Sequence, residues 1–431
     1  MDDLKAAADG ERKLKPYLSP LGAFALALGC AVGQGAFLMP GRVFLPIGGP
    51  LGTAIGMLLG AGVMLIIAGN YHYLVNRYPD AGGAFTYAKK ILGYDHGFLT
   101  AWFLLLAYVA VLWANTTAVP VILRYLVGDF FQVGDYAFAG QKLYLGEVGV
   151  ALVALLAACL LCMKKSFGAA VQIICALALC VTVALAFVLV FEGRPLAVSS
   201  FEPLFSTKIG WGLGILNLVA LAPWAFVGFE GISNSAAEFR FDRRKTWRIL
   251  ALAVGVGTAL YVMLTLIAIS TLPAGCDSWS DYILNLSEPR FQTTNAARPT
   301  FFGMFSALGE FGRALFAIGG LGAVLTGIVG NYIAASRLLF AMADDQLLPG
   351  WFGRLNRDHA PRNALLFILA VSLFLPFFGR TAISWIVDVT TIGATIVYGY
   401  TSAAAWLAAR AEGDRRLSLC GFLGVTISAS F

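Results

Sequence analysis

The feature that most constrains this chain is a series of apolar runs, each long enough to cross a lipid bilayer. A membrane-spanning helix needs about 20 mostly apolar residues, and hydrophobic residues make up 59% of the 431 in this chain. The sequence predicts ten such spans, followed by an apolar run that begins at Leu417. The spans lie near residues 21–45, 50–75, 97–127, 146–163, 167–191, 211–238, 248–272, 312–342, 363–378 and 383–408. We therefore expect an all-α, multi-pass protein of the cell (inner or plasma) membrane, in contact with lipid.

Lysine and arginine residues predict which side of the membrane each loop faces. Cytoplasmic loops carry the excess of these residues, and an internal N-terminus places 21 of the 30 on the cytoplasmic side and 9 outside. Residues 1–20 are charged and lack the apolar region of a cleavable signal peptide. The N-terminus is therefore predicted to be cytoplasmic, and the segment 274–311 to be external. The net charge of +6 requires no nucleic-acid partner, because the basic residues after the sixth span suit anionic lipid headgroups.

Two of the spans contain glycine-flanked polar residues. In the first, Gly33 and Gly35 enclose Gln34, and each glycine costs roughly 1 kcal/mol relative to alanine inside a helix. In the sixth, Gly228 and Gly231 enclose Glu230. Paired interruptions of this kind in the two halves of a chain are the best sequence indication of a transporter's substrate site. The alternative is close helix packing, which small residues also serve.

Shorter features predict two surface helices. A Gly-Gly and a proline frame an amphipathic segment that is expected to end near Gly93. In the external segment, Trp279, Tyr282, Ile283 and Leu286 recur at helical spacing, which predicts a short helix over the outer mouth. The tenth span carries polar residues that suit an aqueous path, namely Asp388, Thr390, Thr391, Tyr398 and Tyr400.

Metal and catalytic chemistry have little support in the sequence. The three histidines lie near predicted cytoplasmic ends of helices, and Cys159 and Cys162 have no partner ligands nearby. The motifs of serine hydrolases, zinc proteases and nucleotide-binding enzymes do not occur. We expect no catalytic residues, no metal site and no organic cofactor.

Four motifs, in order and spacing, together resemble the amino acid/polyamine/organocation (APC) superfamily, including bacterial amino acid permeases and its arginine/agmatine antiporter. They are Gly33 to Phe37 with Pro40, Arg77 to Pro79 with Ala81 to Gly83 and Tyr87, Trp224 to Glu230, and Ala343 to Asp345 with Leu347 and Pro349. The resemblance implies two inverted five-helix repeats, residues 21–191 and 211–408, with helices 1 and 6 unwound in mid-membrane. It also implies two further helices, so that residues 417–431 would begin helix 11 of a longer protein.

The resemblance also assigns roles to residues at the two breaks. Gln34 and Gly35 stand where the family's amides hold a substrate carboxylate, and Ala31 and Val227 where carbonyl groups accept from its ammonium. Trp224 matches a substrate-contacting aromatic residue. The predicted substrate-binding set is Ala31, Val32, Gly33, Gln34, Gly35, Trp224, Val227, Phe229, Glu230 and Asn331. Two departures argue against arginine as substrate, because Gln34 replaces a serine and Asn331 replaces a tryptophan that stacks on a guanidinium group.

The predicted function is secondary active transport of small to medium zwitterionic amino acids by alternating access, coupled to protons or working by exchange. The alternatives are an amine, polyamine or cationic amino acid antiporter, and beyond those a channel, a sensor or a membrane enzyme.

Coupling is assigned to Glu230, which matches a gating glutamate of the family. A buried charge in mid-membrane costs roughly 2.5 to 3.5 kcal/mol, and keeping the carboxyl group protonated at neutral pH costs about as much, so Glu230 could exist in either form. The alternative is a permanently ionised Glu230 that holds the unwound backbone through N–H bonds. Sodium has less support, because Ser336 offers one hydroxyl group where the family's sodium sites use a pair. Residues 167–191 contain no lysine, which some proton-coupled relatives carry in this helix, so Glu230 is the main candidate for a titrating group.

Overall fold

The computed structural model describes residues 14–192, 201–292, 294–379 and 381–430, except for the side chains of residues 381–389, which include Asp388. Among these residues, six helical segments are long and apolar enough to cross a membrane. They contain α4 (Leu45–Arg77), α6 (Tyr94–Val127), α7 (Leu145–Met163), α8 (Lys165–Phe191), α11 (Thr246–Ala268) and α14 (Pro299–Asp344). Shorter apolar helices include α2 (Pro20–Ala31), α9 (Trp211–Ala220) and α15 (Arg362–Ser372). The prediction of a helical chain with several membrane-spanning helices is confirmed.

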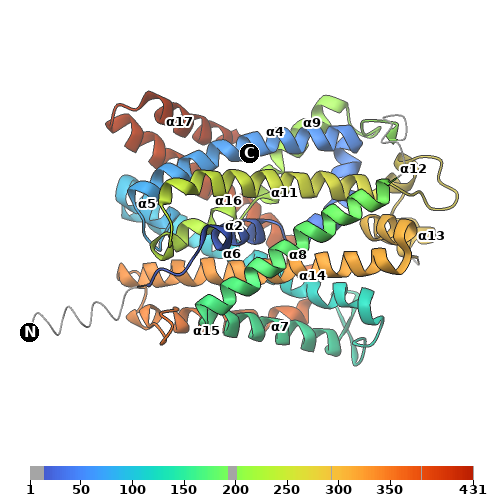
Figure 1. The fold of residues 1–431 in the computed structure, drawn as a ribbon, viewed down its shortest axis with the longest axis horizontal. Helices are drawn as coiled ribbons and strands as arrows, with labels where there is room; N and C mark the ends of the chain where they lie inside the picture. The colour runs from blue at the N-terminus through green and yellow to red at the C-terminus, as the bar shows by residue number, and fades with distance from the viewer. Residues whose placement is uncertain (1–13, 193–200, 293, 380, 431) are drawn as a thin grey trace, which may run out of the picture.

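The long helices run side by side along the longest dimension of the molecule (Figure 1). Helix α14 packs against α6 and α8, α4 packs against α9 and α11, and α16 (Thr381–Ala411) packs against α6 and α17 (Arg415–Ser430). In Figure 1, α2 lies in the middle of this bundle. Helices α12 (Trp279–Leu284) and α13 (Pro289–Gln292) lie at one end, called here the α12 end, and α5 (Ala84–Leu92) lies at the opposite, α5 end.

Burial separates the central helices from those that face lipid. In the most apolar 18-residue stretch of α14, 78% of the residues are buried, against 28% in α8. The exposed residues of α8 include Phe167, Ile174, Val181 and Val188, each at least 59% exposed. Their seven-residue spacing places them on one face of the helix, which suits contact with lipid chains.

The smaller predicted helices are confirmed. α5 ends at Leu92 and is followed by Gly93 at φ 110°, a left-handed conformation that favours glycine. α12 begins after Ser278, whose hydroxyl group accepts the Asp281 N–H. Its residues Trp279, Tyr282 and Ile283 are buried, so the apolar face of this helix packs against the protein.

Two boundaries differ from the sequence prediction. The eighth span was expected to begin near residue 312, but helical backbone begins at Pro299 and bends at Gly309, where φ is 59°. The charged Glu310 and Arg313 interrupt the apolar pattern there, which hides the preceding helical turns. In α4 the backbone bends at Gly49 (φ 69°), directly before Pro50, so the first and second spans join without a loop.

A short hairpin is the exception to the all-α prediction. β1 (Asp135–Phe138) pairs antiparallel with β2 (Gln141–Tyr144), with Asp135 opposite Tyr144. The connecting residues Ala139 and Gly140 both have positive φ, as in the two-residue turns that suit hairpins. Four-residue strands between two membrane spans leave too short an alternating pattern to be predicted.

The other short elements are single turns or brief helices. They are α3 (Gly35–Met39), the π-helix η1 (Pro40–Phe44), α10 (Ala222–Ala225), η3 (Phe229–Glu238), η4 (Arg243–Lys245), η5 (Asn295–Ala297), η6 (Gly350–Gly353) and η7 (Leu375–Phe378). Three of them, α3, α10 and η3, form the interruptions described next.

Candidate substrate site

The first interruption lies between α2 and α3. Helix α2 ends at Ala31, Val32 takes an extended conformation (φ −99°, ψ 90°), and α3 begins at Gly35. Asn115 of α6 holds this break, because its Oδ1 accepts the Gln34 N–H at 3.0 Å. A Cβ on Gly33 would lie only 2.8 Å from Asn115 Nδ2. Glycine at position 33 therefore allows α6 to approach the broken backbone.

The second interruption follows α10. Gly228 has a left-handed conformation (φ 103°), and the chain continues as the ten-residue 3₁₀ helix η3. Such helices are usually only three or four residues long. A Cβ on Gly228 would lie 2.7 Å from the carbonyl oxygen of Cys30 in α2, and one on Gly35 would lie 2.9 Å from Trp224 Cη2. The structure thus brings the two interruptions into direct contact.

Backbone groups at the two breaks are left unpaired. Within the described part of the chain, no hydrogen bond is made by the N–H groups of Gly33 and Gly35 or by the carbonyl groups of Ala31 and Val227. The N-terminal end of a helix favours an anion, and its C-terminal end favours a cation. An unpaired N–H and an unpaired carbonyl group in one place can hold both the carboxylate and the ammonium of an amino acid. The Gln34 N–H, expected to hold the carboxylate, is bonded instead to Asn115.

Glu230 lies directly after the second break and is 1% exposed. Its Oε2 accepts the Gly228 N–H at 3.0 Å and the Tyr398 hydroxyl at 2.9 Å. Its Oε1 has no hydrogen-bond partner among the described residues. Phe229, also predicted to be in the site, packs edge-on against Tyr71 and Tyr398. Glu230 therefore fixes the unwound backbone through one oxygen, and the buried Tyr108 hydroxyl also lies beside its carboxyl group.

Comparison with known proteins places the chain in a family. The amino acid permease family profile matches residues 18–431. The chain belongs to the amino acid permease family. Members of this family are transporters and not enzymes, in agreement with the sequence analysis.

Individual relatives of the permease are distant and carry different substrates. The branched-chain amino acid permease BcaP of Lactococcus lactis is 24% identical, over 95% of this chain and 86% of the relative. The arginine/ornithine antiporter of Latilactobacillus sakei is 24% identical, over 96% and 85%. The methylthioribose transporter of Bacillus subtilis is 23% identical, over 91% and 81%. Their names span apolar, cationic and sugar-like solutes, so likeness at this level does not select one.

Asn331 of the permease bonds within its own helix. Its Nδ2 donates to the Gly327 carbonyl of α14 at 2.8 Å, and the side chain is fully buried. Asn115, which is not among the predicted site residues, contacts the first break. The available signal was an asparagine in the middle of an apolar span, where polar side chains usually bond to another helix or a cavity.

A glutamine links three helices of the permease beside the first break. Gln172 of α8 donates through Nε2 to the carbonyl oxygens of Ala25 in α2, at 3.3 Å, and of Thr326 in α14, at 3.0 Å. A Cβ on Gly330 would lie 3.2 Å from the same nitrogen. Gln172 therefore occupies the point at which these two carbonyl groups converge.

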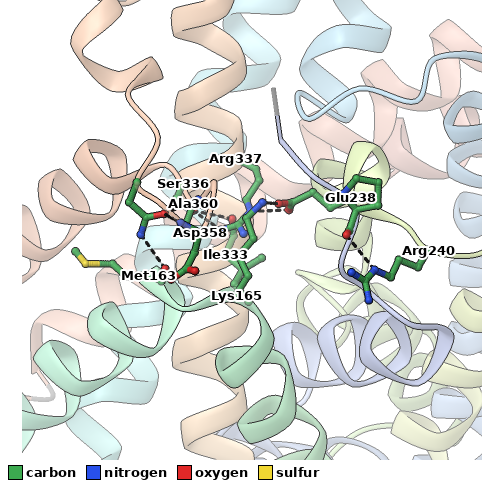
Figure 2. A network of polar contacts seen from close by, with 11 residues as sticks. Met163, Lys165, Glu238, Arg240, Ile333, Ser336, Arg337, Asp358 and Ala360 are labelled. Carbon is green, nitrogen blue, oxygen red and sulfur yellow. Dashed lines mark hydrogen bonds and ion pairs between the residues drawn. The ribbon is translucent and has the colours of Figure 1, made fainter. Parts of the chain in front are cut away.

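Figure 2 shows a buried charge cluster formed by Lys165, Glu238 and Arg337, which we call the Glu238 cluster. Glu238 Oε2 accepts from Arg337 Nε at 2.9 Å, and Lys165 forms an ion pair with Glu238 Oε1. These side chains are 0%, 1% and 5% exposed, respectively. Lys165 Nζ also lies 5.3 Å from the ring centre of Tyr17, whose backbone N–H donates to the Glu238 carbonyl at 2.9 Å.

This cluster is not among the sequence predictions, although the sequence carries a signal for it. Arg337 falls inside a predicted span and Glu238 at the end of another, and charged residues inside spans usually pair with one another. The cluster joins η3, α8, α14 and the segment before α2. These are the same elements that carry the two breaks or adjoin them.

Proposed function

We propose that the chain is a secondary active transporter that carries small to medium zwitterionic amino acids across the cell membrane by alternating access. The observation that supports this most is the contact between the two interrupted helices. Unpaired N–H and carbonyl groups flank this contact, in the two interrupted segments, the second of which also carries Trp224 and Glu230. Asn331 supplies no flat surface for a guanidinium group, which disfavours arginine.

The proposal includes the repeat architecture. We propose that residues 21–191 and 211–408 form two inverted five-helix repeats, with residues 417–431 as the start of helix 11 and residues 1–20 as a cytoplasmic segment. The two interruptions fall in α2–α3 and in α9–α10–η3, the first helical units of these two halves. Substrate sites at such repeat interfaces typically use discontinuous helices.

We propose that coupling uses protons and not sodium. Backbone carbonyl groups beside a broken helix are typical sodium ligands in such transporters. Here the converging carbonyl groups of Ala25 and Thr326 already accept an amide from Gln172. The hydroxyl group of Ser336 likewise accepts from Arg337 Nη1 at 3.1 Å. Glu230 remains as the buried carboxyl group next to the candidate site.

Blocking either end of the substrate is expected to abolish binding. A site built to pair a charged group rejects the analogue that lacks it, by as much as about 10⁴-fold. The purified protein should be screened by thermal shift against amino acids, and the best ligand then compared with its methyl ester and its decarboxylated amine. Equal stabilisation by the ester or by simple diamines would contradict the assignment and favour the amine antiporter. Saturable uptake and exchange in liposomes would separate a carrier from a channel.

Cys276 provides a test of the proposed orientation, in which the α12 end faces outward. Cys276 is partly buried, and burial together with the nearby Asp281 raises the pKa of its thiol. The reactive thiolate is therefore scarcer than usual at neutral pH, and labelling should be faster at about pH 8.5 than at pH 7. A membrane-impermeant maleimide should label intact cells, and a Cys276→Ser variant gives the background. If Cys276 is labelled only after permeabilisation, while the denatured protein still reacts as a control, the α12 end faces the cytoplasm.

A further inference from the structure

A cavity of about 540 Å³ opens at the α12 end, and we call it the vestibule. This volume is in the range of small-molecule sites. The vestibule is lined by α3, η1, α6, β2, α7, η7 and the residue that precedes α14. Its charged lining residues are Arg42, Arg124, Lys142, Glu147 and Arg298. The lining therefore holds four basic side chains and one acidic side chain.

Two of the basic side chains are already neutralised. Arg124 forms a two-pronged pair with Glu147, at 2.5 and 2.6 Å. Lys142 pairs with Asp135 at 3.2 Å across the hairpin. Arg42 and Arg298 form no ion pair with any described residue. Arg298 instead stacks over the ring of Tyr125 at 5.4 Å. The excess positive charge of the vestibule thus resides on Arg42 and Arg298.

The vestibule borders the candidate substrate site. Leu38 and Met39 of α3 line its wall, one turn beyond Gly35. Met39 Cγ and Trp224 Cη2 both lie within 3.8 Å of the position that a Cβ on Gly35 would take. Met39 and Trp224 therefore both lie next to Gly35, at the boundary between the vestibule and the first break. A neighbouring cavity of about 590 Å³ is lined by Arg42 and Lys208 and by no acidic residue.

We propose that the vestibule is an entry site for a carboxylate, which favours amino acids of zero or negative net charge over cationic ones. This inference rests on the proposed transport function and refines its substrate class. Clefts lined by charges of one sign raise the local concentration of ligands of opposite charge, by about tenfold or more. Guanidinium groups also match the planar geometry of a carboxylate. Lysine, arginine and polyamines would meet repulsion at the same place.

The charge of the vestibule can be measured without any transport substrate. A Val121→Cys substitution in a Cys276→Ser background places a thiol on the vestibule wall. Anionic sulfonatoethyl and cationic trimethylammonioethyl methanethiosulfonates should then react at rates whose anion-to-cation ratio is at least about threefold higher than in an Arg42→Gln/Arg298→Gln variant. The ratio should also fall between about 0.01 M and 1 M salt, where the screening length falls from about 30 to 3 Å.

Two further variants test whether charge alone is responsible. Arg42→Lys/Arg298→Lys should keep the ratio, since the charge is retained. Arg290→Gln should leave the ratio unchanged, because Arg290 lies outside the vestibule lining and pairs with Glu288 at 2.7 Å. An equal ratio in the Arg→Gln double variant and the parent would overturn the proposal.

Transport supplies the second measurement, with L-glutamine, L-glutamate and L-lysine as similarly sized competitors of charge 0, −1 and +1. The Arg→Gln double variant should raise inhibition by L-lysine relative to L-glutamate by at least about threefold. A changed reagent ratio with unchanged competition would overturn the role in substrate selection. Complete absence of amino acid uptake would contradict the proposed function, while the reagent rates would still decide the charge of the vestibule.

Discussion

Replacing Glu238 with glutamine is expected to lower the free energy of unfolding by about 3 to 5 kcal/mol. Glu238 is the only carboxylate paired with Lys165 and Arg337 in the Glu238 cluster as the structure describes it. Its removal leaves two buried cations side by side with no other described carboxylate in ion-pair contact. Breaking a buried ion pair costs this much because the remaining charge has lost its compensation. The measurement is SDS-induced unfolding of the purified protein in mixed micelles.

A second substitution should recover part of the loss. In Glu238→Gln/Arg337→Met, a single buried cation remains, so the double variant should be more stable than Glu238→Gln alone. A matched control is Glu310→Gln, which removes the partner of Arg313 on the same helix α14. That pair is 68% and 44% exposed, and such surface pairs contribute only about 0 to 1 kcal/mol. Additive losses in the double variant, or equal losses in Glu238→Gln and Glu310→Gln, would contradict the charge argument.

The Glu238 cluster illustrates what sequence reasoning could and could not predict. Apolar length predicts each span locally, and a glycine-flanked polar residue predicts a local break, so both were accessible from the sequence. Pairing among Lys165, Glu238 and Arg337 depends on which helices adjoin in space. Lys165 precedes the predicted span 167–191, so the sequence gives no sign that it is buried, whereas the structure buries it beside the Tyr17 ring.

The candidate site likewise combines features that could be predicted from the sequence with features that could not. Backbone groups of Ala31, Gly33, Gly35 and Val227 belong to the breaks themselves, and their unpaired state follows from broken helical geometry. Partners that come from other helices were harder to assign. The assignment of Asn331 rests on its distance from a motif along the sequence; its Nδ2 bonds to its own helix, its Oδ1 has no partner among the described residues, and its contact with substrate stays a prediction. Spacing along a chain does not determine which face of a helix is turned toward a neighbour.

Glu230→Gln is expected to remove the pH dependence of uptake, which is the largest functional effect we predict. A carboxyl group that carries the coupled proton should make uptake rise as the outer pH falls from about 8 to about 5.5, whereas a glutamine cannot release a proton. The contacts of the Glu230 carboxyl group are compatible with both its ionised and its protonated form. Two donors, from Gly228 and Tyr398, compensate a negative charge on Oε2, and the unpartnered Oε1 can carry a hydrogen. The charge-burial penalty of roughly 2.5 to 3.5 kcal/mol is small enough for a bound ammonium to offset.

Liposome uptake measured over this pH range, with and without a sodium gradient, tests the role of Glu230. Substrate binding by Glu230→Gln, followed by thermal shift, separates lost coupling from lost folding. Tyr398→Phe is the matched variant, because it removes one hydrogen-bond donor to Glu230 but keeps the carboxyl group. Uptake by this variant should still depend on pH, with a displaced midpoint of the pH profile. If Glu230 only holds the backbone as a permanent anion, a folded Glu230→Gln protein will retain the parent pH profile. That result, or uptake that requires sodium, would contradict the assignment of proton coupling to Glu230.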